Sequence, residues 1–470
     1  NTPGYSRQRV DLAAFDPYAP STYAVGLIDK GQLGQGVEVQ GVTRIRDQFI
    51  DGQYRLQNSI FGFNTDIRDI LQQLEGILVE PSGAGINASI QDFFDAAQAL
   101  SVEPQSTAVR QDFLQHGVDL ITVFQQQATQ LQELQENLVG NPAIPGSFQT
   151  SQLAINVTDI NNKLEEIAAL NSEILTIKSS GAAPNDLYDR RDLLLDELSS
   201  LVQIDVNDTA NGLVSIDIGG QRMVQGVTLV DTLEVVANPA AAPASDFEPS
   251  LVQTVNGGVD ILASATPIEY GQIKGIIDAA GRSTTHTTVR GQLEELNTLF
   301  DSIATAMNTL QLSGRDINGN VPTDPFFELT AGAGLSVFRY AVDPDLLNNP
   351  SSLAAAEGPP NAFLGPGDGE NALAMAQLRD ATYAALGNTG FVDYFNGILS
   401  GTGIDTRTFE NRADNQESVT NSLDLRRQSI AGVNTDEELI DLVRYQRAFE
   451  ASSKMVQSFN EIYQTLINMT

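Results

Sequence analysis

The amino-acid sequence predicts a mainly α-helical protein that carries an inserted β domain. Over long stretches at both ends of the chain, apolar residues recur at three- and four-residue steps, the spacing of coiled-coil-like helices. In 201–281 they alternate with polar residues, as in strands. We therefore expect a long helical-bundle core domain made from both ends of the chain, plus an inserted all-β domain.

Composition narrows the class of protein. The 470 residues exceed what one core holds, so two to four domains are expected. The 26 Lys and Arg residues against 60 Asp and Glu residues give a net charge of −34, which argues against nucleic acid as a partner. No apolar run is long enough to cross a membrane, and no cleaved secretory signal opens the chain. Without cysteine, disulfides and thiolate metal sites are excluded.

The segment 1–200 reads as the N-terminal part of the helical core domain. A turn at Pro3-Gly4 precedes an extended stretch, and 37–40 alternates like a strand. The Gly-x-Gly at 34–36 lacks the spacing of a phosphate loop, so we expect a plain turn there. Helical spacing then covers 45–77, 90–100, 109–138, 157–174 and 193–202.

A charge-dense run, Asn-Asp-Leu-Tyr-Asp-Arg-Arg-Asp, occupies 185–192. It could be a carboxylate active site. Acids and bases alternate in it and no histidine or glycine nest is adjacent, so we expect its Asp and Arg side chains to pair locally at helical offsets.

The segment 201–281 is predicted to be the inserted β domain. Asn211-Gly212 and Gly219-Gly220 are hairpin signals, 238–249 reads as a loop, and strand-like runs resume at 251–261 and 268–270. A carboxylate-dependent glycan hydrolase in this insert is an alternative, although its acids form no recognisable pair. These candidate acids are Asp217, Asp231, Glu234, Asp246, Glu248, Asp260 and Glu269.

Helix returns in 282–431, the C-terminal part of the core domain. A helix starting at Thr288 keeps heptad spacing without a polar break, and 313–370 is a Pro- and Gly-rich irregular segment with short strands near Phe326 and 335–340. Helices are expected again at 371–386 and 405–428. The residues of this core seam are Val289, Leu293, Leu296, Phe300, Ile303, Met307 and Leu310.

The final segment, 432–470, is predicted to be one amphipathic helix. Asn434 and Thr435 supply a cap, and Asp436 begins a negative first turn that the helix dipole favours. A helix of this kind is marginal in isolation, because burial of its apolar seam does not offset the entropy cost of ordering its backbone. It therefore needs another apolar helix, from this chain or from another copy. Its seam, interrupted only by Ser452, consists of Leu442, Tyr445, Phe449, Val456, Phe459, Tyr463 and Leu466.

The other candidate metal-binding motifs are incomplete. His116 and His286 have no metal-binding partners at a recognisable spacing. Asp316, Asn318 and Asn320 begin like a calcium loop, but Val321 and Phe327 stand where that loop requires glycine and glutamate, so a side-chain-capped turn is expected. We therefore expect no enzyme, no cofactor and no metal.

The terminal sequences resemble a known family. The runs 429–434, 436–438, 442–446 and 449–452 resemble the C-terminal signature of the bacterial flagellar axial proteins, which form rod, hook and hook-associated structures. The opening 1–10 resembles the end of their N-terminal signature. Because a long helix precedes that point in the family, we expect the natural chain to begin upstream of Asn1. Val42, 46–47, 92–94, 167–171 and 185–192 narrow the resemblance to the hook-associated proteins beside the hook.

The resemblance implies a structural, self-assembling subunit that joins hook to filament in the extracellular flagellum. It implies export in unfolded form through the flagellar type III channel. In the assembled shaft it implies that 432–470 packs in the inner tube and that the all-β domain of 201–281 stands outward. The implied partners are further copies in a ring, the hook protein, the second junction protein, and a cytosolic chaperone that binds the C-terminal helix. The alternatives within the family are the second junction protein and a hook subunit, against which the length and the 185–192 run argue.

Overall fold

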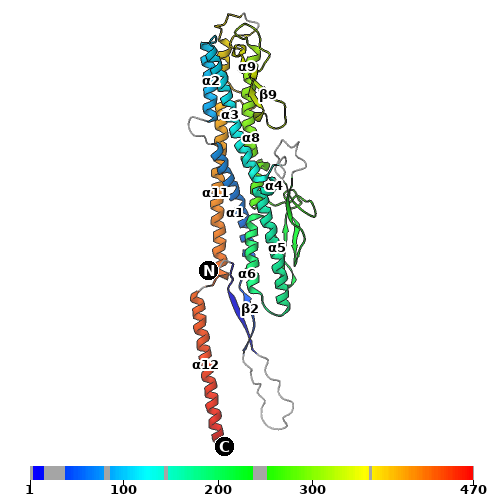
Figure 1. Ribbon diagram of the computed structural model, residues 1–470. Coiled ribbons are helices and arrows are strands. Elements are labelled where there is room, and N and C mark those ends of the chain that lie inside the picture. The colour runs from blue at the N-terminus through cyan, green and yellow to red at the C-terminus, as the bar shows by residue number, and fades with distance from the viewer. Residues whose placement is uncertain are drawn as a thin grey trace.

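The computed structural model describes residues 4–14, 37–78, 85–141, 147–236, 251–358, 363–433 and 435–468. Three predicted features lie outside this part of the chain: the turn at 34–36, the loop at 238–249 and the cap at Asn434. The described elements form an elongated rod of helices with a small sheet region on one side, and one helix extends beyond the lower end of the rod (Figure 1). This architecture confirms the predicted fold class, mainly α with inserted β structure.

Long helices make up the rod, and most of them follow the predicted stretches. Short 3-10 or π turns connect several of them. The long helices are α1 (Gln48–Leu78), α2 (Ile86–Val102), α3 (Thr107–Val139), α5 (Gln152–Ser179), α6 (Asn185–Leu201), α8 (Val289–Ser313), α11 (Phe391–Ala431) and α12 (Thr435–Asn468). The short ones are α4 (Ser147–Thr150), α7 (Gln272–Ile277), α9 (Pro344–Asn348) and α10 (Glu370–Gln377).

Side-chain caps define where several helices begin. The hydroxyl of Ser106 accepts a hydrogen bond from the Val109 amide, Ser151 does the same for Ala154, and Thr288 for Gly291. Each cap satisfies an amide that has no partner within the helix. The starts of α3, α5 and α8 are therefore encoded locally.

The predicted core seam lies on α8, which packs against α3 in the rod (Figure 1). The six residues of this seam from Val289 to Met307 are buried, and Leu310 is half-buried. A cluster of phenylalanine rings continues this core toward the upper end of the rod, where Phe326 stands 4.7 Å from Phe327 and 5.1 Å from Phe113 between ring centroids.

The strands form small antiparallel sheets. A meander of four strands runs in chain order, and its first two turns are the predicted Asn211-Gly212 and Gly219-Gly220, whose positive φ angles confirm the hairpin prediction. The strand pairs are β1 (Gln8–Ala14) with β2 (Val37–Arg44), β7 (Leu233–Val236) with β8 (Leu251–Thr254), and β9 (Phe327–Leu329) with β10 (Tyr340–Val342). The meander contains β3 (Asp205–Asp208), β4 (Val214–Ile218), β5 (Gln221–Gln225) and β6 (Thr228–Leu229).

The sheet region is hydrogen-bonded to α5 and shares its apolar core with the helices. The Asn171 amide group donates to the carbonyls of Val214 and Gly226, and the Asn161 side chain bonds both the amide and the carbonyl of Leu233. Buried residues of β4 and β5 belong to the same apolar cluster as the helices. The inserted strands are therefore oriented by a helix of the rod.

Several element boundaries differ from those predicted. The run 251–261 contains only the short β8, and no strand forms at 268–270 among the described residues. The helix predicted at 371–386 ends at Gln377, and left-handed backbone at Gly387 and Asn388 separates it from α11. Helix α11 begins at Phe391 and not at 405, because its packing on α1 extends the helix beyond the region of clear periodicity.

A close approach brings α7 against α1 around Asp66. A Cβ atom on Gly275 would lie only 2.9 Å from the Phe63 carbonyl oxygen, so only glycine fits there. The Asp66 carboxyl is close to this contact, and its Oδ2 is buried without a hydrogen-bond partner. Burial, reinforced by Asp69 and opposed by Arg68, raises the pKa of Asp66 from 3.8 to about 7.

We predict that Asp66→Asn stabilises the protein at neutral and alkaline pH. Between pH 3.8 and about 7 the folded state binds more protons at Asp66 than the unfolded state, so its contribution to stability falls as the pH rises through this window. The free energy of unfolding of the variant should exceed that of the parent by about 2–4 kcal/mol at pH 8 and by much less near pH 5. Urea unfolding at both pH values measures this, and a pH-independent difference would contradict it.

Candidate functional site

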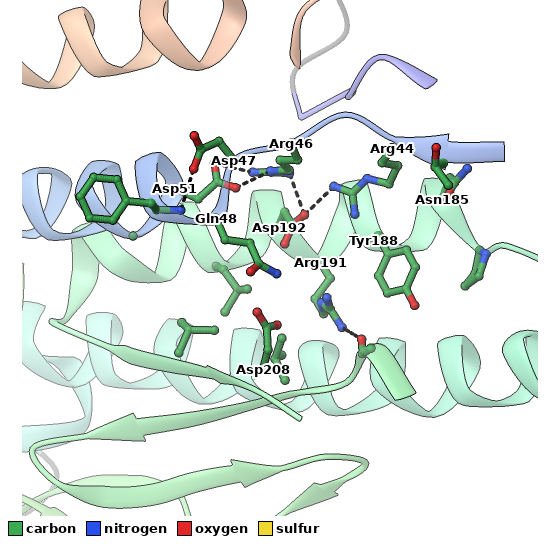
Figure 2. A pocket seen from close by; sticks show the side chains of 18 of the residues that line it. Arg44, Arg46, Asp47, Gln48, Asp51, Asn185, Tyr188, Arg191, Asp192 and Asp208 are labelled. Atoms are coloured by element: carbon green, nitrogen blue, oxygen red, sulfur yellow. Dashed lines mark hydrogen bonds and ion pairs between the residues drawn. The ribbon is translucent and has the colours of Figure 1, made fainter. Parts of the chain in front are cut away.

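The lower end of the rod, from which α12 and the ribbon of β1 and β2 both leave, is held by a compact network of charges (Figures 1 and 2). Four arginines alternate with four aspartates, and their side chains are only 8–15% exposed. We call these eight residues the ionic junction. They are Arg44 and Arg46 before α1, Asp51 and Arg55 on α1, Asp189, Asp192 and Asp196 on α6, and Arg427 on α11.

Each member of the ionic junction contacts residues far away in the sequence. Arg44 lies 2.8 Å from Asp189 and 2.6 Å from Asp192. Arg46 connects Asp192 and Asp51, both at 2.7 Å. Arg55 lies 2.9 Å from Asp196.

Arg427 closes the network from α11. It lies 2.9 Å from Asp51 and 2.6 Å from Asp196, and its guanidinium stacks 4.3 Å above the Tyr54 ring. The strand before α1 and the helices α1, α6 and α11 are thus joined by one set of ion pairs.

Burial and neighbouring charges shift the pKa values of Asp192 and Arg46 in opposite directions. Burial would raise the pKa of Asp192, but Arg46, Arg44 and Arg55 together hold it below its ordinary value. Burial likewise would lower the pKa of Arg46, and Asp192 and Asp51 raise it above the usual range. These groups therefore stay charged near neutral pH and are unsuited to proton transfer.

This network corrects one prediction. The acids and bases of 185–192 do not pair locally: Asp189 and Asp192 bind arginines of β2 and α1, and Arg190 pairs with Glu166 of α5. Arg191 donates to Asn171 Oδ1 and to the Gly212 carbonyl. The local prediction was wrong because α6 is packed between other elements, so its charges face partners that sequence spacing cannot reveal.

An open cleft of about 1620 Å³ lies beside the ionic junction, between β2, the start of α1, α6 and β3 (Figure 2). The Tyr188 ring lies between the guanidinium groups of Arg44 and Arg191, 5.4 and 5.0 Å from its centroid. The charges on the α1 side of this cleft neutralise one another. Among the described residues, no three His, Asp or Glu side chains are grouped so that they could hold a metal ion.

Most of the described candidate acids of the β region are bound by neighbouring groups. Asp217 pairs with Arg222, Asp231 accepts bonds from the amides of Thr232 and Asn256, and Glu234 accepts one from Gln253. The Asp260 carboxylate caps the Leu262 amide, Glu269 is exposed after the last strand, and Asp246 and Glu248 lie outside the described residues.

The remaining candidates have structural contacts. His116 on α3 lies 3.9 Å from Asp112, and the His286 ring packs edge-on against Phe409 at 5.0 Å. Asp316 Oδ1 accepts from the amides of Asn318 and Asn320, both at 2.8 Å, which confirms the predicted capped turn.

Helix α12 presents the predicted assembly seam to solvent. Leu442, Tyr445, Phe449, Val456 and Phe459 are between 52% and 74% exposed, whereas the side chains of Tyr463 and Leu466 are outside the described part. The helix packs on no other long helix of the described chain and extends away from the rod (Figure 1). Its first turn is attached through Arg7, which lies 2.7 Å from Glu437 and 3.5 Å from Glu438.

The predicted seam covers only part of the apolar surface of α12. At about 100° per residue, Met455 and Ile462 form a second stripe beside it, so that roughly half of the circumference is apolar beyond Tyr445. Leu439, Ile440 and Val443 lie on the opposite side in the first two turns, and all are exposed. The heptad pattern missed them, although their clustering within five residues is visible in the sequence.

Comparison with known proteins gives two family matches. Residues 71–327 match the family described as "Flagellar hook-associated protein FlgK helical domain", and 427–469 match "Flagellar basal body rod FlgEFG protein C-terminal". No helix in the described chain is long and apolar enough to span a membrane.

Full-length relatives agree with these matches. The flagellar hook-associated protein 1 of Bacillus subtilis (strain 168) is 30% identical over 491 residues, an alignment that covers 100% of this chain and 92% of the relative. That of Salmonella typhimurium (strain LT2) is 26% identical over 550 residues, covering 100% and 95%. The structure of the flagellar hook junction protein FlgK from Burkholderia pseudomallei has the same fold, with a TM-score of 0.66 at 16% identity, covering 81% of this chain and 100% of that one.

We predict that Asp192→Asn destabilises the rod. The substitution leaves Arg44 and Arg46 buried without their shared carboxylate, which should lower the free energy of unfolding by about 3–5 kcal/mol at pH 7. Because the pKa of Asp192 is depressed in the folded state, its contribution is complete above the ordinary aspartate pKa and is lost as the pH falls below about 4.

Chemical denaturation at pH 7 and in the acid range measures this effect. Asp186→Asn, an exposed position of the same helix, is the control and should change stability by about 0.5 kcal/mol or less. Equal stabilities of the two variants at pH 7 would rule out the network as a major contributor.

Proposed function

The chain belongs to the flagellar hook-associated protein 1 family and is a structural subunit of the bacterial flagellum at the junction of hook and filament, and we propose that it assembles there through its exposed C-terminal helix. The observation that carries this proposal is the apolar surface of α12, which the described part of the chain leaves uncovered. A surface of this kind on an otherwise polar helix marks a protein interaction site.

The partners we propose follow from the amount of apolar surface. A single coiled-coil seam takes one neighbour, whereas an apolar arc of about half the circumference accommodates a helix on each side. A ring of identical copies supplies these neighbours, because each α12 then contacts the next one. The hook protein and the second junction protein are the proposed neighbours above and below the ring.

Before assembly the exposed apolar stripe of α12 needs to be covered. An exposed apolar helix face in the cytosol promotes premature association, so we propose a cytosolic chaperone that covers α12 until export. Export through the flagellar channel as an unfolded chain is compatible with the absence of cysteine, since no disulfide has to form or break.

A non-enzymatic role is part of the proposal. It is supported by the Asp192 carboxylate, which arginines hold charged, and by the acids of the β region, most of which contact an arginine, an amide or a backbone group. A glycan hydrolase would need two facing carboxyl groups at about 5–10 Å with different pKa values. We propose that the chain consists of the domain segments 1–200, 201–281, 282–431 and 432–470.

We predict that Phe449→Asp blocks incorporation into the flagellum and leaves the rod folded. Phe449 is 74% exposed in the single chain, so the substitution should not alter its stability. In the assembly it would bury an unpaired charge at a cost of several kcal/mol, about 3–5 by analogy with broken buried ion pairs. Gln457→Asp, on the polar face of the same helix, is the matched control and should assemble normally.

Electron microscopy of cells that carry only the variant chain tests this prediction. Hooks without filaments are expected for Phe449→Asp, together with the variant protein in the culture medium, which separates failed assembly from failed export. Normal filaments would refute the role of the seam.

We also predict that α12 gains hydrogen-exchange protection on assembly. In the monomer its amides rely on local helical bonds alone and should exchange with little protection, whereas those of α11, packed on α1, should be protected. Comparing the purified monomer with isolated flagella measures the difference. Strong protection across 442–466 in the monomer would be incompatible with an uncovered stripe.

A further inference from the structure

Arg7 has its backbone on the rod and its side chain on α12. Its amide donates to the Ala431 carbonyl at 2.6 Å, and its own carbonyl accepts from the Ile45 amide at 2.9 Å. The preceding residue, Ser6, is buried, and its amide donates to Asp189 of the ionic junction at 3.1 Å. The base of the Arg7 side chain is therefore held in place where the ribbon of β1 and β2 meets the end of α11.

The Arg7 guanidinium contacts two consecutive glutamates in the first turn of α12. Its Nη1 lies 2.7 Å from Glu437, and its Nε lies 3.5 Å from Glu438. Consecutive residues of an α-helix project about 100° apart. One planar guanidinium reaches both carboxylates only while the helix presents the arc between them, so the double contact restricts the rotation of α12 about its own axis as well as its tilt.

This arc lies beside the predicted seam. Glu438, Leu442 and Tyr445 follow one another at steps of four and three residues, so they lie on the same face of α12. Arg7 thus contacts the first turn of the face on which the seam begins. A contact that restricts the rotation of the helix also determines the direction in which the seam faces.

The contact is weak enough to be broken. The Arg7 side chain is 26% exposed, and those of Glu437 and Glu438 are 54% and 49% exposed. Two pairs exposed to this degree change an equilibrium by about two- to tenfold, and salt screens them. Within the described chain no other long helix packs on α12 to add to this, and the helix extends away from the rod (Figure 1).

We propose that Arg7 orients α12 in the free chain through its ion pairs with Glu437 and Glu438. These pairs favour one tilt and one rotation of the helix, so the seam faces a defined direction before any partner binds. A partner that covers the seam can replace this direction by another, because apolar burial over several turns contributes more than two exposed ion pairs. This orientation is a property of the single chain and does not depend on the proposed function.

Spin labels measure the direction of α12, because the chain contains no cysteine that would compete for them. Glu417→Cys on α11 and Glu450→Cys on α12 carry the labels at exposed positions, and the distance distribution between them is recorded in the full chain diluted with unlabelled copies. Asn460→Cys, about 80° around the helix from Glu450, replaces the second label to report rotation. In Arg7→Gln the ratio of the parent orientation to all others should fall by about two- to tenfold at low ionic strength.

Two further variants separate this effect from a general loss of charge. Arg9→Gln is the matched control, because Arg9 is 70% exposed and pairs with Asp11 inside the ribbon, so the distribution should stay as in the parent. Exchanging the charges, with Arg7→Glu, Glu437→Arg and Glu438→Arg combined, should restore the narrow distribution. Raising the salt concentration to about 1 M should broaden that of the parent, because the screening length falls to about 3 Å.

The inference is overturned if Arg7→Gln and the parent give the same distribution at low ionic strength, or if Arg9→Gln broadens it equally. Failure of the charge exchange to narrow the distribution, in a chain whose helix content equals that of the parent, would also overturn it. Should a variant not fold, the salt dependence of the parent decides the question alone. A distribution that salt leaves unchanged would show that ion pairs do not orient the helix.

Discussion

The lower end of this molecule depends on the ionic junction. Three segments that are far apart in the sequence, 44–55, 189–196 and 427, meet there through alternating arginines and aspartates. Apolar packing alone could let α1, α6 and α11 slide along one another, because helical grooves repeat every turn. Charge pairs that are largely buried permit one register only, since any shift leaves a charge unpaired at high cost. The ionic junction therefore fixes the end of the rod from which the ribbon of β1 and β2 and helix α12 extend.

The chain distributes its apolar residues between two tasks. In the rod, stripes such as that of α8 are sealed within one cluster, which makes a single copy stable. In α12 an equally regular stripe is left open by the described residues, so its free energy of burial is available to an assembly. The strongly acidic surface keeps separate copies apart in solution, whereas salt screens charges beyond about 8–10 Å and affects contacts at van der Waals distance much less.

Periodic and local features were predictable from the sequence, and contacts between distant segments were not. The seam from Val289 to Met307 and the turn at Gly219-Gly220 follow from spacing and from backbone freedom, which act within a few residues. The partners of Asp189 and Asp192 depend on which helices become neighbours, so spacing pointed to the wrong ion pairs. The apolar residues on the opposite side of α12 were overlooked for a different reason: a heptad template selects one face of a helix and passes over apolar residues elsewhere.

The joint between α11 and α12 explains why the direction of α12 has to be set by its neighbours. Only Gly432, Val433 and one further residue connect the two helices, and a cavity of about 720 Å³ adjoins the joint. Near this joint Arg7 ties α12 to the rod by pairing with two glutamates that are about half exposed, and exposed pairs contribute little. The rod thus fixes the position of the root of α12 much more strongly than its direction. In the proposed ring, neighbouring helices can then impose one direction on every copy without straining the rod.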